Sequence, residues 1–237
     1  MSALLEINDL WGGYTDGVDI LRGISMEVQQ GEAVGIIGLN GSGKSTFGKA
    51  IMNMIPIRRG EILFDGEDIT ALSTSQLAHR GISIMQQGGR IFPNLSVWDN
   101  LQLAMSSNSK FKIQNSKLEE VIPLLRQPKK ELEHLMADKL SGGQKHQLSL
   151  AMTLATNPSL VILDEPSAGL SPKAVEDMYQ MLRDVRLKLN VTIILIEQNI
   201  AKAVEFCTGC YLLEQGLIKR ESRFNNLTEI NNRMFNK

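Results

Sequence analysis

Residues 38–45 read Gly38-Leu39-Asn40-Gly41-Ser42-Gly43-Lys44-Ser45, and this octet decides the fold class of the chain. It fits the pattern G-x-x-x-x-G-K-[ST], a loop that cradles phosphate, and it stands between an apolar run and a run compatible with a helix. Glycines let the backbone curl and aim successive N–H groups at phosphate oxygens. Lys44 adds positive charge near the β- and γ-phosphates, and the Ser45 hydroxyl is a ligand for Mg²⁺. This phosphate loop predicts a nucleoside triphosphate site.

The pattern around the phosphate loop predicts an α/β fold. Strand-sized apolar runs such as Leu160 to Leu163 and Thr192 to Ile196 alternate with helical stretches. This alternation is typical of a parallel sheet that is buried on both faces.

The first part of the chain has a different pattern. Residues 1–30 alternate short apolar runs with glycines at Gly12-Gly13, Gly17 and Gly23, which we interpret as turns between antiparallel strands. Residues 94–156 are expected to be mostly helical, apart from an exposed polar connection from Ser106 to Ser116.

Composition narrows the class of protein. The chain has 237 residues, 43% of them hydrophobic, which suits one compact domain or two joined subdomains. Its formal net charge of −1 gives no reason to expect nucleic acid as a partner. The longest apolar runs fall well short of the ~20 residues of a membrane span, and the N-terminus lacks the pattern of a signal peptide. We therefore expect a cytosolic protein that reaches a membrane only through a partner.

A second chemical motif is a strand that ends in two acids, Asp164 and Glu165, after the apolar residues 160–163. Two carboxylates at the end of a buried strand repel each other, so they are a poor structural device. They suit a Mg²⁺ site in which Asp164 belongs to the coordination shell of the ion and Glu165 polarises the attacking water.

The third motif, Leu140-Ser141-Gly142-Gly143-Gln144, begins twenty residues before the apolar strand. With it, residues 4–220 resemble the ATP-binding-cassette (ABC) ATPases, whose signature it matches. The resemblance implies a RecA-like phosphate-loop core with a parallel sheet, an antiparallel β subdomain and a helical subdomain. It places the core in residues 1–87 and 157–237 and the helical subdomain in residues 88–156 of a single ABC ATPase domain.

The same resemblance implies the ligands, ATP and Mg²⁺, and a role for each site residue. Tyr14 would stack on adenine, and Ser45, Asp164 and Gln87 would hold the metal, with the neighbouring Gln86 as the alternative to Gln87. Lys44, Glu165, Gln87 and Gln198 would act in catalysis. Nucleotide contacts would come from the phosphate loop with Thr46 and from the signature, namely Gly38, Asn40, Gly41, Ser42, Gly43, Lys44, Ser45, Thr46, Ser141, Gly142, Gly143 and Gln144.

In this family two subunits pair head to tail, and the signature of one chain touches the γ-phosphate held by the other. The start of the helix after Ser141 and Gly143 suits such a contact, because its N–H groups face an anion. The resemblance thus implies a homodimer, or a heterodimer with a sister ATPase, bound to integral-membrane permeases on the inner face of the cell membrane.

The chain departs from the family at the switch position after the last core strand, where most members have a histidine. Glu197-Gln198-Asn199 places Gln198 there, and none of the three histidines stands at that position. This triplet is typical of the ATPases of branched-chain amino-acid importers, the LivF-like branch. Met152 stands where the family usually has an arginine, and the tail after Glu221 departs from the usual ending.

We therefore expect the ATP-hydrolysing subunit of an importer, with a solute-binding protein as an indirect partner. An importer of urea, another amide or another amino acid is the alternative within the class. A soluble ABC ATPase, such as one in iron–sulfur assembly, is the alternative outside it. Chromosome-type members have a long coiled coil and translation-type members have two cassettes, and this sequence shows neither.

Overall fold

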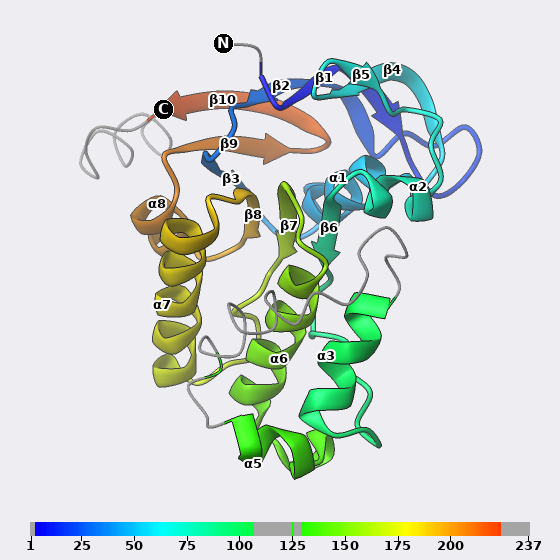
Figure 1. Cartoon of the computed structure of the whole chain (residues 1–237). Coiled ribbons are helices and arrows are strands. Elements are labelled where there is room, and N and C mark those ends of the chain that lie inside the picture. Colours follow the sequence, from blue (N-terminus) through cyan, green and yellow to red (C-terminus); the bar gives the residue numbers. More distant parts are fainter. Residues whose placement is uncertain (1–2, 107–124, 126–128, 224–237) are drawn as a thin grey trace. The chain divides into compact units, whose positions relative to one another are not determined.

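The computed structural model describes residues 3–106, 125 and 129–223 (Figure 1). Two compact units make up the chain: Met1–Leu77 with Thr192–Lys237, and Ala78–Val191. The division expected from the sequence, with a helical subdomain at residues 88–156, stays a prediction. The expected connection from Ser106 to Ser116 lies outside the described residues after its first one.

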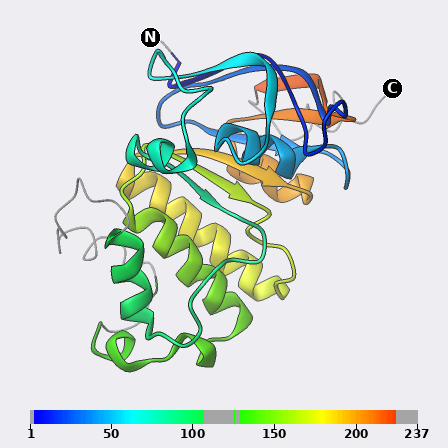
Figure 2. The same ribbon diagram turned by 90° about the vertical axis from the view of Figure 1, so that its right-hand side faces the viewer.

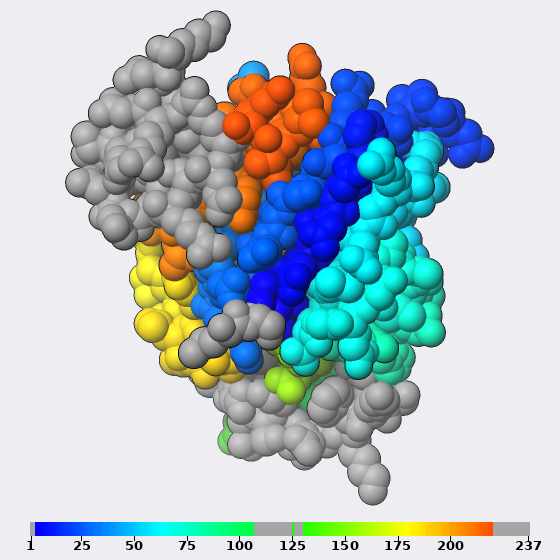
Figure 3. Space-filling model, turned by 90° about the horizontal axis from the view of Figure 1, so that it is seen from above, coloured from blue at the N-terminus to red at the C-terminus, as the bar shows by residue number. Residues whose placement is uncertain are grey.

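An antiparallel sheet occupies one part of the first unit, as the glycine-rich start of the chain predicts. Its strand order is β2-β1-β4-β5. The strands are β1 (Leu5–Gly12), β2 (Leu21–Val28), β4 (Ile57–Phe64) and β5 (Glu67–Asp68). In Figure 3, β1 in dark blue runs between β2 in lighter blue and β4 in cyan.

One glycine does not form the turn expected for it. Gly23 lies inside β2 with a φ of 81°, where the pairing steps from Leu10↔Ile24 to Trp11↔Arg22 and leaves Gly23 out. It is therefore the residue of a β-bulge, which bends the strand without ending it. Asp65 and Gly66 form the tight turn between β4 and β5, with φ of 51° and 75°.

The same unit holds the parallel strands that carry the phosphate loop. β3 (Ala33–Ile37) pairs in parallel with β8 (Thr192–Glu197) and β9 (Gly209–Glu214), and β10 (Leu217–Arg223) pairs antiparallel with β9. Every residue of β3 and β8 is buried, as the apolar runs predict. The helices are α1 (Lys44–Ile51), α2 (Thr74–His79, whose last residues belong to the second unit) and α8 (Ile200–Phe206).

The second unit combines two parallel strands with several helices. β6 (Ile82–Met85) pairs with β7 (Leu160–Asp164). Its helices are α3 (Val97–Ser106), α5 (Lys129–His134), the short 3-10 turn Ala137–Lys139, α6 (Gly142–Ala155) and α7 (Pro172–Leu189). Figure 2 shows α6 with α7 along one side and α3 along the other, and both contact it. No helix in the described part of the chain is both long and apolar enough to cross a membrane.

Candidate active site

The phosphate loop curls at the two glycines that its pattern requires. Gly41 and Gly43 have φ of 76° and 105°, in the left-handed region that favours glycine. α1 begins directly after Gly43, which has no side chain to cap it. The Lys44 ammonium is almost fully buried and donates to the carbonyl oxygens of Gly38 at 2.9 Å and Leu39 at 3.1 Å. These bonds hold its positive charge inside the curl.

The turn that joins β9 and β10 supports this loop from the far end of the chain. Gly216 N–H donates to the carbonyl oxygen of Ser42 at 2.9 Å, and a side chain on Gly38 would clash with the carbonyl oxygen of Leu213. The Ser42 hydroxyl is buried and makes no hydrogen bond within the described residues. A buried hydroxyl without a partner is costly, so this loop fits a bound group rich in acceptor oxygens, as a phosphate is.

The two acids lie where β7 ends, as the sequence predicts: Asp164 is in the strand and Glu165 follows it. Asp164 is the last, buried residue of the strand at 3% exposure, whereas Glu165 is partly exposed and has a φ of 48°. A left-handed conformation is rare for a residue other than glycine, and such strain concentrates at functional sites. Gln87 Nε2 donates to Glu165 Oε2 at 2.8 Å, so the structure brings together two of the predicted catalytic residues.

The signature forms the first turn of α6. Ser141 Oγ accepts a hydrogen bond from Gln144 N–H at 3.3 Å, and Gln144 Oε1 accepts one from Ser141 N–H at 2.9 Å. This reciprocal pair is a capping box, which satisfies two backbone donors at once. Gly143 faces α7: an added Cβ would lie 2.9 Å from Ala174 Cβ, closer than the packing allows. Gly142 has open space around it, so packing alone does not require a glycine there.

The switch position follows β8. Gln198 is exposed, and the buried Glu197 holds the backbone there: its Oε2 accepts from the N–H groups of Gln198 and Asn199, each at 3.0 Å. The Asn199 side chain in turn caps α8 by accepting from Lys202 N–H at 3.2 Å. The turn that presents Gln198 is therefore fixed by its own two neighbours.

Tyr14, the predicted adenine-stacking residue, is half exposed in the first unit. The Lys49 ammonium from α1 lies 5.5 Å from the centroid of its ring and 3.3 Å from its hydroxyl oxygen. A cation at this distance is attracted by the ring quadrupole, so Lys49 orients Tyr14.

The structure distributes the predicted residues between the two units. Tyr14, the phosphate loop and Gln198 belong to the first, whereas Gln87, the acids and the signature belong to the second. Sequence reasoning missed two residues beside these sites: Lys49, which contacts Tyr14, and His146, which contacts Pro166 next to Glu165. Nothing in the sequence distinguishes Lys49 from other lysines on a helix surface. His146 likewise reads as an ordinary helical residue two positions after the signature.

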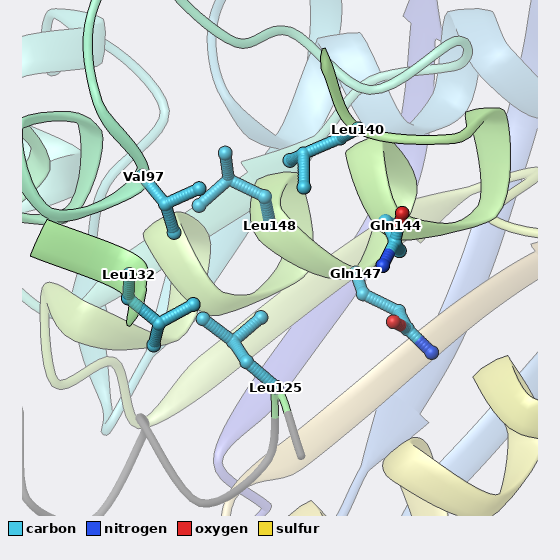
Figure 4. A pocket seen from close by; sticks show the side chains of 7 residues that line it. All are labelled: Val97, Leu125, Leu132, Leu140, Gln144, Gln147 and Leu148. Atoms are coloured by element: carbon cyan, nitrogen blue, oxygen red, sulfur yellow. The ribbon is translucent and has the colours of Figure 1, made fainter. Parts of the chain in front are cut away.

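A small hollow lies beside the first turns of α6 (Figure 4). Aliphatic side chains from several helices point into it, and the two polar side chains come from α6. Its lining consists of Val97, Leu125, Leu132, Leu140, Gln144, Gln147 and Leu148. The hollow is partly open to solvent and its lining is mostly apolar, so we assign it to helix packing and not to substrate binding.

The donors predicted for Mg²⁺ suit that ion. Ser45, Asp164 and Gln87 offer a hydroxyl, a carboxylate and an amide oxygen, and Mg²⁺ prefers oxygen ligands and usually keeps several waters besides substrate phosphates. The described residues contain no group of three or more His, Cys, Asp or Glu side chains that could hold a metal by themselves. Each predicted donor is thus of a type that Mg²⁺ accepts alongside phosphate oxygens.

Comparison with known proteins adds independent information. The model of the family described as ABC transporter matches residues 21–168. The branched-chain amino acid transport ATP-binding protein BraG of Pseudomonas aeruginosa is 32% identical, over 86% of this chain and 87% of that one. The probable LivF protein of Archaeoglobus fulgidus is 31% identical over 95% and 94%. The lipopolysaccharide export protein LptB of Escherichia coli K12 is also 31% identical, over 90% and 88%.

Solved structures give the same result for the fold. An ATP-binding cassette of an ABC transporter in its ADP conformation superposes with a TM-score of 0.83 at 26% identity, and covers 98% of this chain and 94% of that one. The cbiO1 protein of Clostridium perfringens, part of an ABC transporter complex, superposes with a TM-score of 0.84, also at 26% identity, over 99% and 96%. The fold class expected from the sequence is therefore confirmed.

Proposed function

Because this chain belongs to the ABC transporter family and is an ATPase subunit of that kind, we propose that it drives the import of branched-chain amino acids. The observation that carries this proposal is its similarity to BraG and LivF along nearly the full length of both proteins. The Glu197-Gln198-Asn199 triplet, which departs from the usual histidine switch, supports the same branch.

The site residues divide the work of hydrolysis. The phosphate loop and Thr46 hold the phosphates, Lys44 supplies positive charge to them, and Tyr14 holds the adenine. Ser45, Asp164 and Gln87 would hold Mg²⁺, which neutralises charge on the β- and γ-phosphates when bound. Glu165 accepts a proton from the attacking water, and its bond from Gln87 keeps one carboxylate oxygen oriented. Gln198 donates a neutral hydrogen bond to the γ-phosphate.

The chain acts as a dimer, with itself or with a sister ATPase, in which Ser141, Gly142, Gly143 and Gln144 contact the nucleotide of the partner. Permease subunits then place the dimer at the inner face of the cell membrane, and a solute-binding protein supplies the amino acid from outside. The support for this arrangement is the family itself, together with the exposed position of Ser141 at the start of a helix.

Uptake in the cell that makes this chain tests the proposal. Deletion of its gene should abolish ATP-dependent uptake of radiolabelled leucine, isoleucine and valine. The parent gene should restore uptake, and the Lys44→Ala gene should not. Radiolabelled urea and methionine, together with lipopolysaccharide assembly, test the other substrates. If the deletion leaves leucine uptake normal but abolishes the transport of one of these other substrates, the proposed substrate is wrong and that one replaces it.

A further inference from the structure

The buried histidine of α6 touches the segment that follows the acids. His146 is 8% exposed, and its Nδ1 lies 2.9 Å from the carbonyl oxygen of Pro166. A carbonyl oxygen can only accept, so Nδ1 must be the donor and must carry the proton. The structure thereby assigns one tautomer to this imidazole.

The bond acts one residue away from Glu165. Glu165 has a left-handed backbone, and a turn closed by Ala168 N–H donating to Glu165 O at 3.1 Å follows it. Pro166 lies within this turn, and its carbonyl oxygen accepts the hydrogen bond from His146. A backbone conformation of this kind persists only when its surroundings fix it, and the His146 bond is one such restraint.

The same part of α6 supports the second segment that touches Glu165. An added Cβ on Gly89 would lie 3.1 Å from Ser149 Cβ and 3.6 Å from His146 Cα, so the turn after Gln87 packs directly on α6. Gln87 donates to the Glu165 carboxylate at 2.8 Å. One helix therefore contacts both segments that orient this carboxylate.

We propose that His146, in its Nδ1–H tautomer, is a positioning residue that aims the Glu165 carboxylate by holding the Pro166 carbonyl. This inference rests on the proposed role of Glu165 in activating water. A misplacement of a catalytic group by about 1 Å is costly in rate, so a restraint on the bend before Pro166 matters for chemistry more than for binding. Because α6 begins at the signature, the same bond ties the signature helix to the acid of its own chain.

Nuclear magnetic resonance of the full chain, labelled with ¹⁵N-histidine, tests the assignment without any turnover. The His146 imidazole should show its proton on Nδ1, and the signal is identified by its loss in His146→Asn. The exposed His134 serves as the internal comparison. An unprotonated Nδ1 at His146 would rule the hydrogen bond out and overturn the proposal.

Single-turnover hydrolysis, with protein in excess over ATP, tests the effect on the chemical step. A net hydrogen bond of about 0.5–1.5 kcal/mol corresponds to a rate loss of roughly two- to tenfold for His146→Leu. ATP affinity, measured by calorimetry, should not change. His146→Asn, which places an N–H near the position of Nδ1, should recover most of the rate, and the matched change His134→Leu should leave it unaltered.

A double-mutant cycle with Gln87→Ala separates positioning from packing. If both residues act on Glu165, the fold-loss in hydrolysis rate of the double variant is smaller than the product of the two single fold-losses. Multiplicative losses, or equal falls in ATP affinity and rate in His146→Leu, would assign His146 to packing. Glu165→Gln keeps the two inferences apart: if it hydrolyses ATP like the parent, the proposed role of Glu165 fails, whereas an inactive Glu165→Gln beside a fully active His146→Leu overturns only the positioning role.

Discussion

The helices α1 and α6 both begin among glycines, yet their first turns are built differently. Gly43, before α1, has no side chain, so it cannot cap the N-terminal N–H groups of that helix. Ser141, before α6, forms a capping box with Gln144 and so takes up one of the N–H groups of α6. Both starts attract anions, but α1 presents its bare backbone and α6 presents a hydroxyl that is already hydrogen-bonded.

The glycines themselves serve different purposes in the two places. Gly41 and Gly43 adopt left-handed backbones that another residue would adopt only with strain. Gly143 has an ordinary helical backbone and is required because Ala174 of α7 lies against it. A glycine-rich helix start thus reflects backbone shape in one unit and close packing in the other.

The largest effect is expected at the start of α1. Lys44→Ala removes the buried ammonium that faces the curl of the phosphate loop, and hydrolysis should fall by about 10²–10³ because such electrostatic contacts carry that much of the rate. Circular dichroism should show that the fold is retained. Hydrolysis near the parent rate would mean that the phosphate loop is not the catalytic site.

The next effect concerns the start of α6 and the partner chain. Glu165→Gln should keep ATP binding, stop water activation and accumulate an ATP-bound dimer, which light scattering detects. Adding Ser141→Arg should prevent that dimer, because it places bulk and charge where the signature would meet the nucleotide of the partner in the proposed dimer. Ser73 forms the same reciprocal pair with Gln76 before α2, so Ser73→Arg is the matched control and should leave the dimer intact.

If Glu165→Gln stays monomeric with ATP at high protein concentration, the self-paired dimer is wrong. The measurement should then be repeated with a sister ATPase from the same cell, which decides between a heterodimer and no dimer.

A third helix start, that of α8, carries an effect of intermediate size. In the proposed mechanism Gln198 donates a hydrogen bond to the charged γ-phosphate. Gln198→Ala would remove that bond, worth about 1.5–3 kcal/mol, so turnover should fall roughly ten- to a hundredfold. Gln198→His should keep substantial activity and gain a pH dependence near the imidazole pKa of about 6.5, which the parent lacks. Steady-state ATPase assays across pH measure both. Unchanged turnover in Gln198→Ala would remove this residue from the mechanism.

The smallest effect separates the cap at α6 from its function. Ser73 and Gln76 form the same reciprocal pair before α2, again at 2.9 and 3.3 Å. Ser141→Ala and Ser73→Ala should each cost about 1 kcal/mol, or roughly 2–4 °C in Tm, because each removes a helix cap. Only Ser141→Ala should also slow hydrolysis. Equal hydrolysis by the two variants would show that Ser141 is a cap and nothing more.

Much of the molecule was predictable from local sequence. The phosphate loop and the acids after an apolar strand depend on the backbone shape of a few consecutive residues, and each forms as expected. Gly23 is the exception, because a glycine with positive φ serves a bulge as well as a turn, and only pairing with the neighbouring strand distinguishes them.

The sequence by itself thus determined the nucleotide chemistry and the α/β class, since motifs and apolar periods are properties of neighbouring residues. Only the tertiary structure decided which side chains meet. Gln87 reaches Glu165 across 78 residues, and His146 reaches Pro166 across 20. Such contacts depend on how helices and strands pack, which no local pattern encodes. The fold, and not the local sequence, therefore places Gln87 against Glu165 and His146 against the residue that follows it.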